Sequence, residues 1–150
     1  MEESLNNIPT CCIIGNVDVG KTKLLDLMRN NNSKEANGIT QQIGATSYSN
    51  KRLKEISGNL SKLIEVESLL MIDTPGHDCF SAMRYIALTV SDIVIVLIDI
   101  NGKIENETLN CLKFIEDKNK LIIFVVNKID TLNNWNKDKK FNFSPIRKVL

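Results

Sequence analysis

The chain has 150 residues, so we expect one domain over residues 1–150, with a flexible N-terminus at residues 1–9. Hydrophobic residues make up 43%, charged residues 25%, and the net charge is +1, which argues against a polybasic nucleic-acid arm or an acidic tail. Residues 1–9 carry acids where a secretory signal carries bases, and the longest apolar run, residues 93–98, is far shorter than the ~20 residues that cross a bilayer. We therefore expect a cytoplasmic protein without membrane contact.

Short apolar stretches predict the strands. There are four of them, at residues 10–14, 69–72, 93–98 and 121–126. Each is apolar on both faces, which is typical of parallel strands that helices cover on both sides.

The segments between these strands predict helices at residues 21–29, 79–90 and 104–117. Strands that alternate with helices indicate an α/β fold, with a mostly parallel sheet and helices on both of its faces. Two segments interrupt the alternation. Residues 30–37 are polar and predict a loop, and residues 51–66 fit either a short helix or a short strand.

The four cysteines are Cys11, Cys12, Cys79 and Cys111, and no two of them form a C-x-x-C pair. This pattern favours buried thiols in a reducing compartment over a disulfide framework or a zinc site.

A phosphate-binding loop is predicted where the first strand meets the first helix. Residues 15–22, Gly-Asn-Val-Asp-Val-Gly-Lys-Thr, match the pattern G-x-x-x-x-G-K-[ST]. Glycines allow successive N–H groups to turn toward phosphate oxygens, and the following helix adds the positive end of its dipole. Lys21 is then expected at the outer phosphates, and Thr22 at Mg²⁺. The alternative is a plain strand–turn–helix corner. The expected contacts are Asn16, Val17, Asp18, Val19, Gly20, Lys21, Thr22 and Lys23.

A second cluster, Asp-Thr-Pro-Gly-His at residues 73–77, follows the second strand. Parallel strands end at one edge of a sheet, so Asp73 should lie beside the phosphate loop and bind Mg²⁺ through water. Taken alone, such an Asp is as often a helix cap. Gly76 leaves its N–H open to a terminal phosphate. His77, the single histidine, could orient an attacking water, although a lone histidine is usually structural or merely exposed.

Asn127-Lys128-Ile129-Asp130 follows the fourth strand and predicts a guanine site. The Asp130 carboxylate can accept from the two donors on one edge of guanine, its N1–H and its amine. Adenine offers an acceptor there and would leave buried groups unpaired. Lys128 can lay its aliphatic stem over the base, and Asn127 can fix the neighbouring loops. A solvated turn is the alternative for the tetrapeptide alone. The nucleotide we expect is GTP or GDP.

These motifs, in this order, are the signature of the GTPase family, and longer stretches resemble one branch of it. Residues 38–46, Gly-Ile-Thr-Gln-Gln-Ile-Gly-Ala-Thr, are similar to switch I of eukaryotic and archaeal initiation factor five-B and bacterial initiation factor two. Residues 68–80 resemble switch II of the same factors, and residues 99–102 and 127–135 also match. Residues 55–66 are similar to an insertion in the eukaryotic form. The resemblance spans residues 12–135.

The resemblance implies roles that the residues alone do not. Thr40 would contact Mg²⁺, and Asp18 would hold a monovalent cation. Val17 and Ile39 would flank His77, which would position water once the large ribosomal subunit engages. The family uses GTP to control subunit joining and contacts initiator tRNA through later domains. The chain itself is expected to be a monomer.

The chain also departs from this family. Asn16 and Val19 stand where histidines are common, and no Ser-Ala-Lys-like loop follows Trp135. We therefore expect a G domain that lacks its C-terminal strand and helix. Two other readings remain: a signalling or trafficking GTPase, where Gln is common at the position of His77, and a nucleotide-binding remnant without catalysis.

Overall fold

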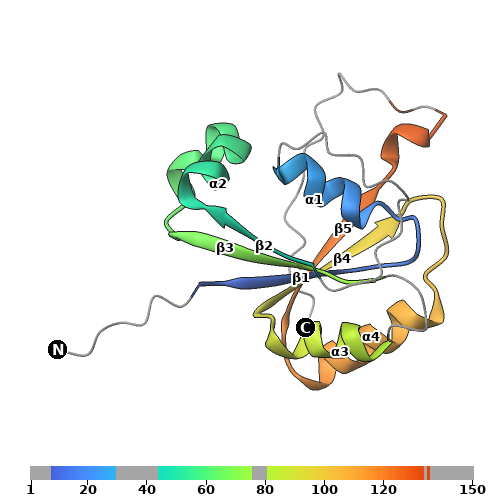
Figure 1. Ribbon diagram of the computed structural model, residues 1–150. Coiled ribbons are helices and arrows are strands. Elements are labelled where there is room, and N and C mark those ends of the chain that lie inside the picture. Colours follow the sequence, from blue (N-terminus) through green and yellow to red (C-terminus); the bar gives the residue numbers. More distant parts are fainter. Residues whose placement is uncertain (1–7, 30–43, 76–80, 134, 136–150) are drawn as a thin grey trace, which may run out of the picture.

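The computed structural model describes residues 8–29, 44–75, 81–133 and 135, and in them the chain forms a five-stranded sheet with helices on both faces (Figure 1). The strand order is β2-β3-β1-β4-β5. The strands are β1 (Thr10–Ile14), β2 (Gly44–Ser49), β3 (Ser68–Asp73), β4 (Ile93–Asp99) and β5 (Leu121–Asn127). The helices are α1 (Lys21–Arg29), α2 (Asn50–Ser57), α3 (Ser81–Val90) and α4 (Asn106–Asp117), with 3₁₀ turns at Gly58–Leu63 and Ile129–Thr131.

The predicted α/β fold and its mostly parallel sheet are confirmed. β1 pairs in parallel with β3 and β4, and β4 pairs in parallel with β5. All four predicted strands are present, and three of them extend one residue further at one or both ends.

Strand β2 is the element that the sequence did not predict. It pairs antiparallel with β3 over its whole length, from Gly44 opposite Asp73 to Ser49 opposite Ser68. Only Tyr48 of its six residues is buried, and small polar residues dominate the rest. Such a strand carries almost no apolar pattern, because its place depends on pairing with β3 rather than on its own side chains.

Two apolar cores follow from the alternation of side chains along β1. Cys11 and Ile13 face α1 and α2, where they pack with Leu25 and Leu53. Cys12 and Ile14 face the opposite side. There α3 and α4 close the second core with Ala87, Leu88, Cys111 and Ile115.

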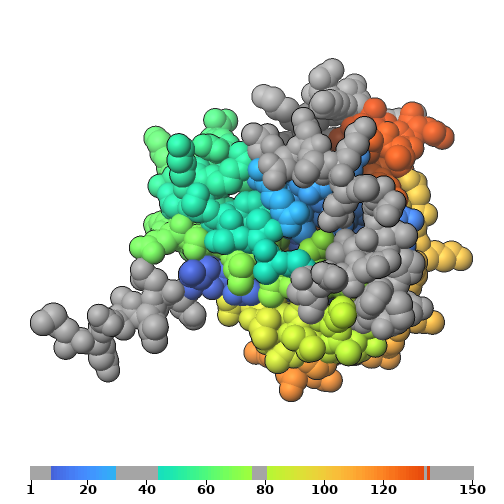
Figure 2. Space-filling view, viewed as in Figure 1, coloured from blue at the N-terminus to red at the C-terminus, as the bar shows by residue number. Residues whose placement is uncertain are grey.

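The segment that fitted either a helix or a strand is helical. Helix α2 starts after Ser49, whose hydroxyl accepts from the N–H of Arg52 at 3.4 Å, and a 3₁₀ turn follows it. The side chain of Arg52 also donates to the carbonyl of Met28, which ties α2 to the end of α1. Together α2 and the 3₁₀ turn gather at the β2 end of the sheet (Figure 2).

Helix α4 begins two residues later than predicted, at Asn106. Glu105 keeps an extended backbone, with φ −77° and ψ 158°, as residues that precede a helix usually do. The start of α3 was predicted at residue 79, and residues 79 and 80 lie outside the described part of the chain.

Strand β5 corrects one expectation. Among the described strands it pairs only with β4, and Leu121 and Phe124, on opposite faces of it, are 65% and 57% exposed. This strand is therefore apolar on both faces although the described residues do not bury both of them.

The three cysteines in the described residues are buried free thiols, as expected. Burial raises the pKa of Cys12 to about 12. No helix in the described ranges is long and apolar enough to cross a bilayer.

Candidate nucleotide site

The loop between β1 and α1 has a backbone that requires its two glycines. Gly15 has φ +152°, and a Cβ there would lie 2.4 Å from the carbonyl oxygen of Leu97. Gly20 has φ +101°, and its Cβ would lie 2.6 Å from Nδ2 of Asn127. A side chain at either position meets neighbouring strands, so the loop can fold tightly only with glycine. Asp18 also has a positive φ, +58°, and is exposed at the tip.

Lys21 lies inside this loop. Its side chain is in the first turn of α1, and the residue is only 7% exposed. Its Nζ donates to the carbonyls of Gly15 at 2.8 Å and Asn16 at 2.7 Å. Burial lowers the pKa of Lys21, while the nearby Asp73 carboxylate opposes that shift. An ammonium held at this point is well placed to meet an anion that enters the loop.

The other residues predicted in the loop differ in exposure. Val19 is buried, Val17 and Thr22 are half-buried, and Lys23 is exposed on α1. Val19 packs against Gly15, so it serves the loop through its shape.

Asp73 ends β3 beside the loop. It pairs in register with Ile13 of β1 and is 5% exposed. The next residue, Thr74, donates from its hydroxyl to the carbonyl of Ile13 at 2.9 Å, which anchors the strand end. The Asp73 carboxylate opposes the fall in the pKa of Lys21, as expected of an acid at the same edge of the sheet.

The donor set here fits Mg²⁺. A carboxylate at Asp73 and a hydroxyl at Thr22 are the oxygen ligands that this ion prefers. No group of three or more His, Cys, Asp or Glu side chains that could hold a metal occurs among the described residues.

The predicted base-reading motif joins the same edge. Asn127 closes β5 opposite Asp99, and its Nδ2 donates to the carbonyl of Val19 at 2.8 Å. The predicted link between this motif and a neighbouring loop is therefore present. Lys128 adopts a left-handed backbone, with φ +59°. Asp130 is exposed in the 3₁₀ turn that follows.

An ion pair orients Lys128. Its Nζ lies 2.7 Å from Oδ2 of Asp99, the last residue of β4. Asp99 also accepts from the N–H of Asn101 at 2.9 Å. Both contacts lower the pKa of Asp99, with Lys128 the larger cause. Motif spacing gave no sign of this pair.

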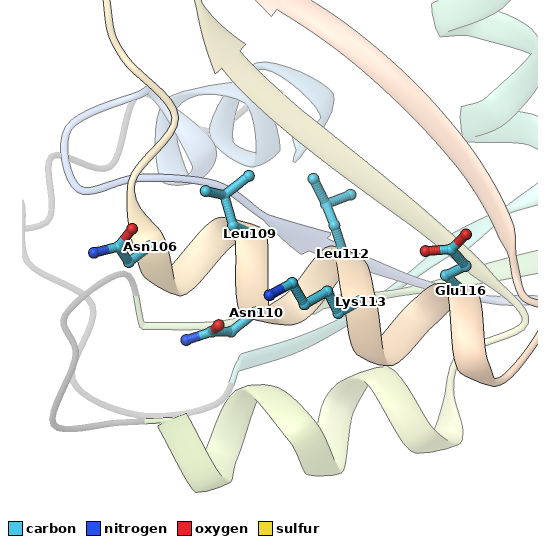
Figure 3. A pocket seen from close by; sticks show the side chains of 6 residues that line it. All are labelled: Asn106, Leu109, Asn110, Leu112, Lys113 and Glu116. Atoms are coloured by element: carbon cyan, nitrogen blue, oxygen red, sulfur yellow. The ribbon is translucent and has the colours of Figure 1, made fainter.

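Several predicted residues lie outside the described part of the chain. These are Thr40, Gly76 and His77, together with Ile39. A hollow along α4 holds none of the predicted site residues (Figure 3). Its described lining is Asn106, Leu109, Asn110, Leu112, Lys113 and Glu116, all from one helix.

Asn16 was predicted only as a contact of the phosphates, and no sequence pattern indicated its bonds to α4 or the burial of Arg84. Asn16 hydrogen-bonds to the turn before α4 and to α4 itself, and Arg84 is buried between Pro75 and α4. The partners of Asn16 lie 87 to 92 positions away along the chain, so no local pattern could have revealed them.

A parallel sheet whose strand ends carry a glycine loop with a buried lysine, a buried aspartate and an Asn-Lys-x-Asp turn defines a P-loop nucleotide-binding domain of the G type. The family model described as "Elongation factor Tu GTP binding domain" matches residues 6–145, and the chain belongs to this family.

The similar proteins include translation initiation factors. The chain is 41% identical over 133 residues to eukaryotic translation initiation factor 5B of Saccharomyces cerevisiae, covering 85% of the chain and 13% of that protein. It is 37% identical over 137 residues to a probable translation initiation factor IF-2 of Thermococcus onnurineus, covering 87% and 23%. The resemblance to this branch is therefore confirmed, and the chain spans under a quarter of either relative.

A solved structure supports the fold. Translation elongation factor SelB from Methanococcus maripaludis, in complex with a GTP analogue, superimposes with a TM-score of 0.65 at 20% identity. The match covers 85% of this chain and 23% of that one.

Proposed function

We propose that this chain is the GTP-binding and GTP-hydrolysing switch of a translation initiation factor that promotes the joining of ribosomal subunits. The observation that carries the proposal is the meeting of three strand ends. Lys21 follows β1, Asp73 ends β3, and Asn127 ends β5 with a direct hydrogen bond to the phosphate loop. One edge of the sheet can thus hold phosphates, a metal and a guanine base.

In this proposal the loop amides from Asn16 to Thr22 surround the phosphates, and Lys21 offsets the charge on the transferring phosphoryl group. Thr22, Asp73 and Thr40 hold Mg²⁺, which supplies further charge neutralisation when it is bound. Gly76 donates its N–H to the terminal phosphate, and His77 orients the attacking water. Asp18 holds a monovalent cation near the phosphates.

Base recognition rests on Asn127, Lys128 and Asp130. The Asp130 carboxylate is exposed and accepts from guanine N1–H and the amine, which adenine cannot supply. The pairing of Lys128 with Asp99 holds the lysine stem in place beside the base.

The similarity to initiation factors supports a proposal for partners and compartment. We propose a cytoplasmic monomer whose parent factor engages the large ribosomal subunit and initiator tRNA. No arginine that could act as a finger stands out in the sequence, so intrinsic turnover should be slow and rise with ribosomes.

A two-stage binding and turnover assay tests the proposal. A fluorescent GTP analogue should bind the chain saturably, and Lys21→Ala should lower its affinity at least tenfold. Lys54→Ala, an exposed lysine on α2 that is not among the predicted contacts, is the matched control. Equal binding by Lys21→Ala and wild type would overturn the assigned site.

Turnover separates the candidates for the whole factor. His77→Ala should keep nucleotide affinity and lose ribosome-stimulated phosphate release. Stimulation that survives this substitution would remove His77 from the mechanism, and a wild type that binds GTP without ever hydrolysing it would favour a remnant.

A further inference from the structure

The first turn of α4 touches both halves of the phosphate site. It contacts the phosphate loop through Asn16 and the end of β3 through Arg84. Neither contact is required by the motifs described above. The two links reach α4 at Glu107 and Thr108.

Asn16 forms the first link with both ends of its amide. Its Nδ2 donates to the carbonyl of Lys103 at 2.6 Å, and its Oδ1 accepts from the hydroxyl of Thr108 at 2.7 Å. Oδ1 also accepts from the N–H of Glu105 at 3.3 Å. The carbonyl of the same residue receives Nζ of Lys21, so the position of the lysine depends on how α4 holds Asn16.

Arg84 forms the second link from α3. It is 3% exposed, its Nη1 donates to the carbonyl of Pro75 at 3.0 Å, and its Nη2 lies 2.7 Å from Oε2 of Glu107. A planar guanidinium fixes both partners at set directions, which a flexible ammonium would not do. Pro75 is two residues beyond Asp73, so Arg84 sets where that strand end lies relative to α4.

Little space separates the two links. Gly15, Asn16, Arg84 and Thr108 help line a cavity of about 10 Å³, which is at most the room of one water molecule. The phosphate loop, α3 and α4 are therefore in near-direct contact here. A tightly packed contact of this kind transmits a displacement instead of absorbing it.

We propose that Asn16 and Arg84 are positioning residues, and that through the first turn of α4 they set the spacing between Lys21 and the Asp73–Pro75 strand end. This inference rests on the proposed function. Asp73 serves the metal at the outer phosphates, so a loosened Arg84 link weakens binding of a triphosphate more than that of a diphosphate. Loosening the Asn16 link moves Lys21, which serves the triphosphate and the diphosphate alike, so it weakens the binding of the two nucleotides more evenly.

The test uses the whole chain with fluorescent GDP and a non-hydrolysable fluorescent GTP analogue. Glu107→Gln keeps the shape of the side chain and removes the charge that holds Arg84. We expect it to shift the ratio of the two affinities toward GDP about fivefold, whereas Thr108→Val should lower both affinities with a smaller change in ratio. Glu116→Gln, on the exposed C-terminal part of the same helix, is the matched control and should stay within twofold (Figure 3).

Arg84→Lys serves as a second variant, because it keeps the charge and loses the planar geometry. It should reproduce the ratio shift of Glu107→Gln, with a thermal unfolding curve recorded for each variant to verify folding. A ratio that is unchanged in both folded variants, or that moves equally in Glu116→Gln, overturns the inference while leaving the proposed function intact. Failure of the wild type to bind either nucleotide overturns both.

Discussion

Gly20 offers the sharpest test of the loop geometry, because an alanine there has two separate costs, one in its backbone conformation and one in its contact with Asn127. An alanine there must adopt φ +101°, a conformation that costs an L-residue about 1–2 kcal/mol. Its Cβ would also lie 2.6 Å from Nδ2 of Asn127, which must then leave its bond to the carbonyl of Val19. Loss of that hydrogen bond costs about a further 1 kcal/mol.

The two costs can be separated by a double-mutant cycle. Gly20→Ala alone should lower the free energy of unfolding by about 2–3 kcal/mol, and Asn127→Ala alone by about 1 kcal/mol. With Asn127 already truncated, the added Cβ has nothing to displace. Gly20→Ala should then cost only its backbone term, about 1–2 kcal/mol, and the pair should deviate from additivity by about 1 kcal/mol.

Denaturant unfolding followed by circular dichroism measures these values without any nucleotide. Gly58→Ala is the control, because Gly58 also has a positive φ, +51°, with nothing within 4 Å of the added Cβ. Its cost should be the same whether or not Asn127 is present. Strict additivity of Gly20→Ala with Asn127→Ala would refute the contact between the base-reading motif and the phosphate loop.

Three further predictions concern chemistry at and around the site. Asp130→Asn should lower the affinity for GTP about 10–100-fold and raise the affinity for xanthosine triphosphate, because xanthine presents a carbonyl to the new amide donor where guanine presents an amine. Titration with both nucleotides measures the two affinities. An equal loss of affinity for both would count against the contact between Asp130 and the base. Chelation of Mg²⁺ should weaken GTP binding by wild type and have much less effect on Asp73→Asn, which a nucleotide titration with and without EDTA would reveal; equal sensitivity would remove Asp73 from the metal site. Burial raises the pKa of Cys12 to about 12, whereas an unfolded thiol ionises near 9.0, so the contribution of this thiol to stability is complete below pH 9 and declines from there toward pH 12. Denaturant midpoints measured across that range should therefore fall less steeply with pH in Cys12→Ala than in wild type. Equal slopes in the two proteins would contradict the raised pKa of Cys12.

The local motifs could be predicted because each rests on a backbone requirement that leaves a mark in the sequence. Gly15 and Gly20 are needed for positive φ and close approach, and the apolar strands before Lys21, Asp73 and Asn127 place these residues at one edge. The helix at residues 50–57 was left open, since its charged sequence with few apolar positions suits more than one structure.

What could not be predicted depends on contacts between distant segments. Strand β2 exists through pairing with β3, and β5 is exposed because of its place at the sheet edge. The buried Arg84 reads in the sequence as an ordinary surface arginine. Its burial follows only from the approach of α4, where Glu107 supplies the opposite charge.

The antiparallel direction of β2 has a mechanical consequence. The other strands finish at the nucleotide edge, whereas β2 starts there, with Gly44 opposite Asp73. Because the hydrogen bonds of this ladder run perpendicular to the strands, a pull on Gly44 along the axis of β2 would load all of the pairs from Gly44 to Ser49 in shear, so that they break together and not one by one. Such a pull on Gly44 would be delivered to the strand that carries Asp73.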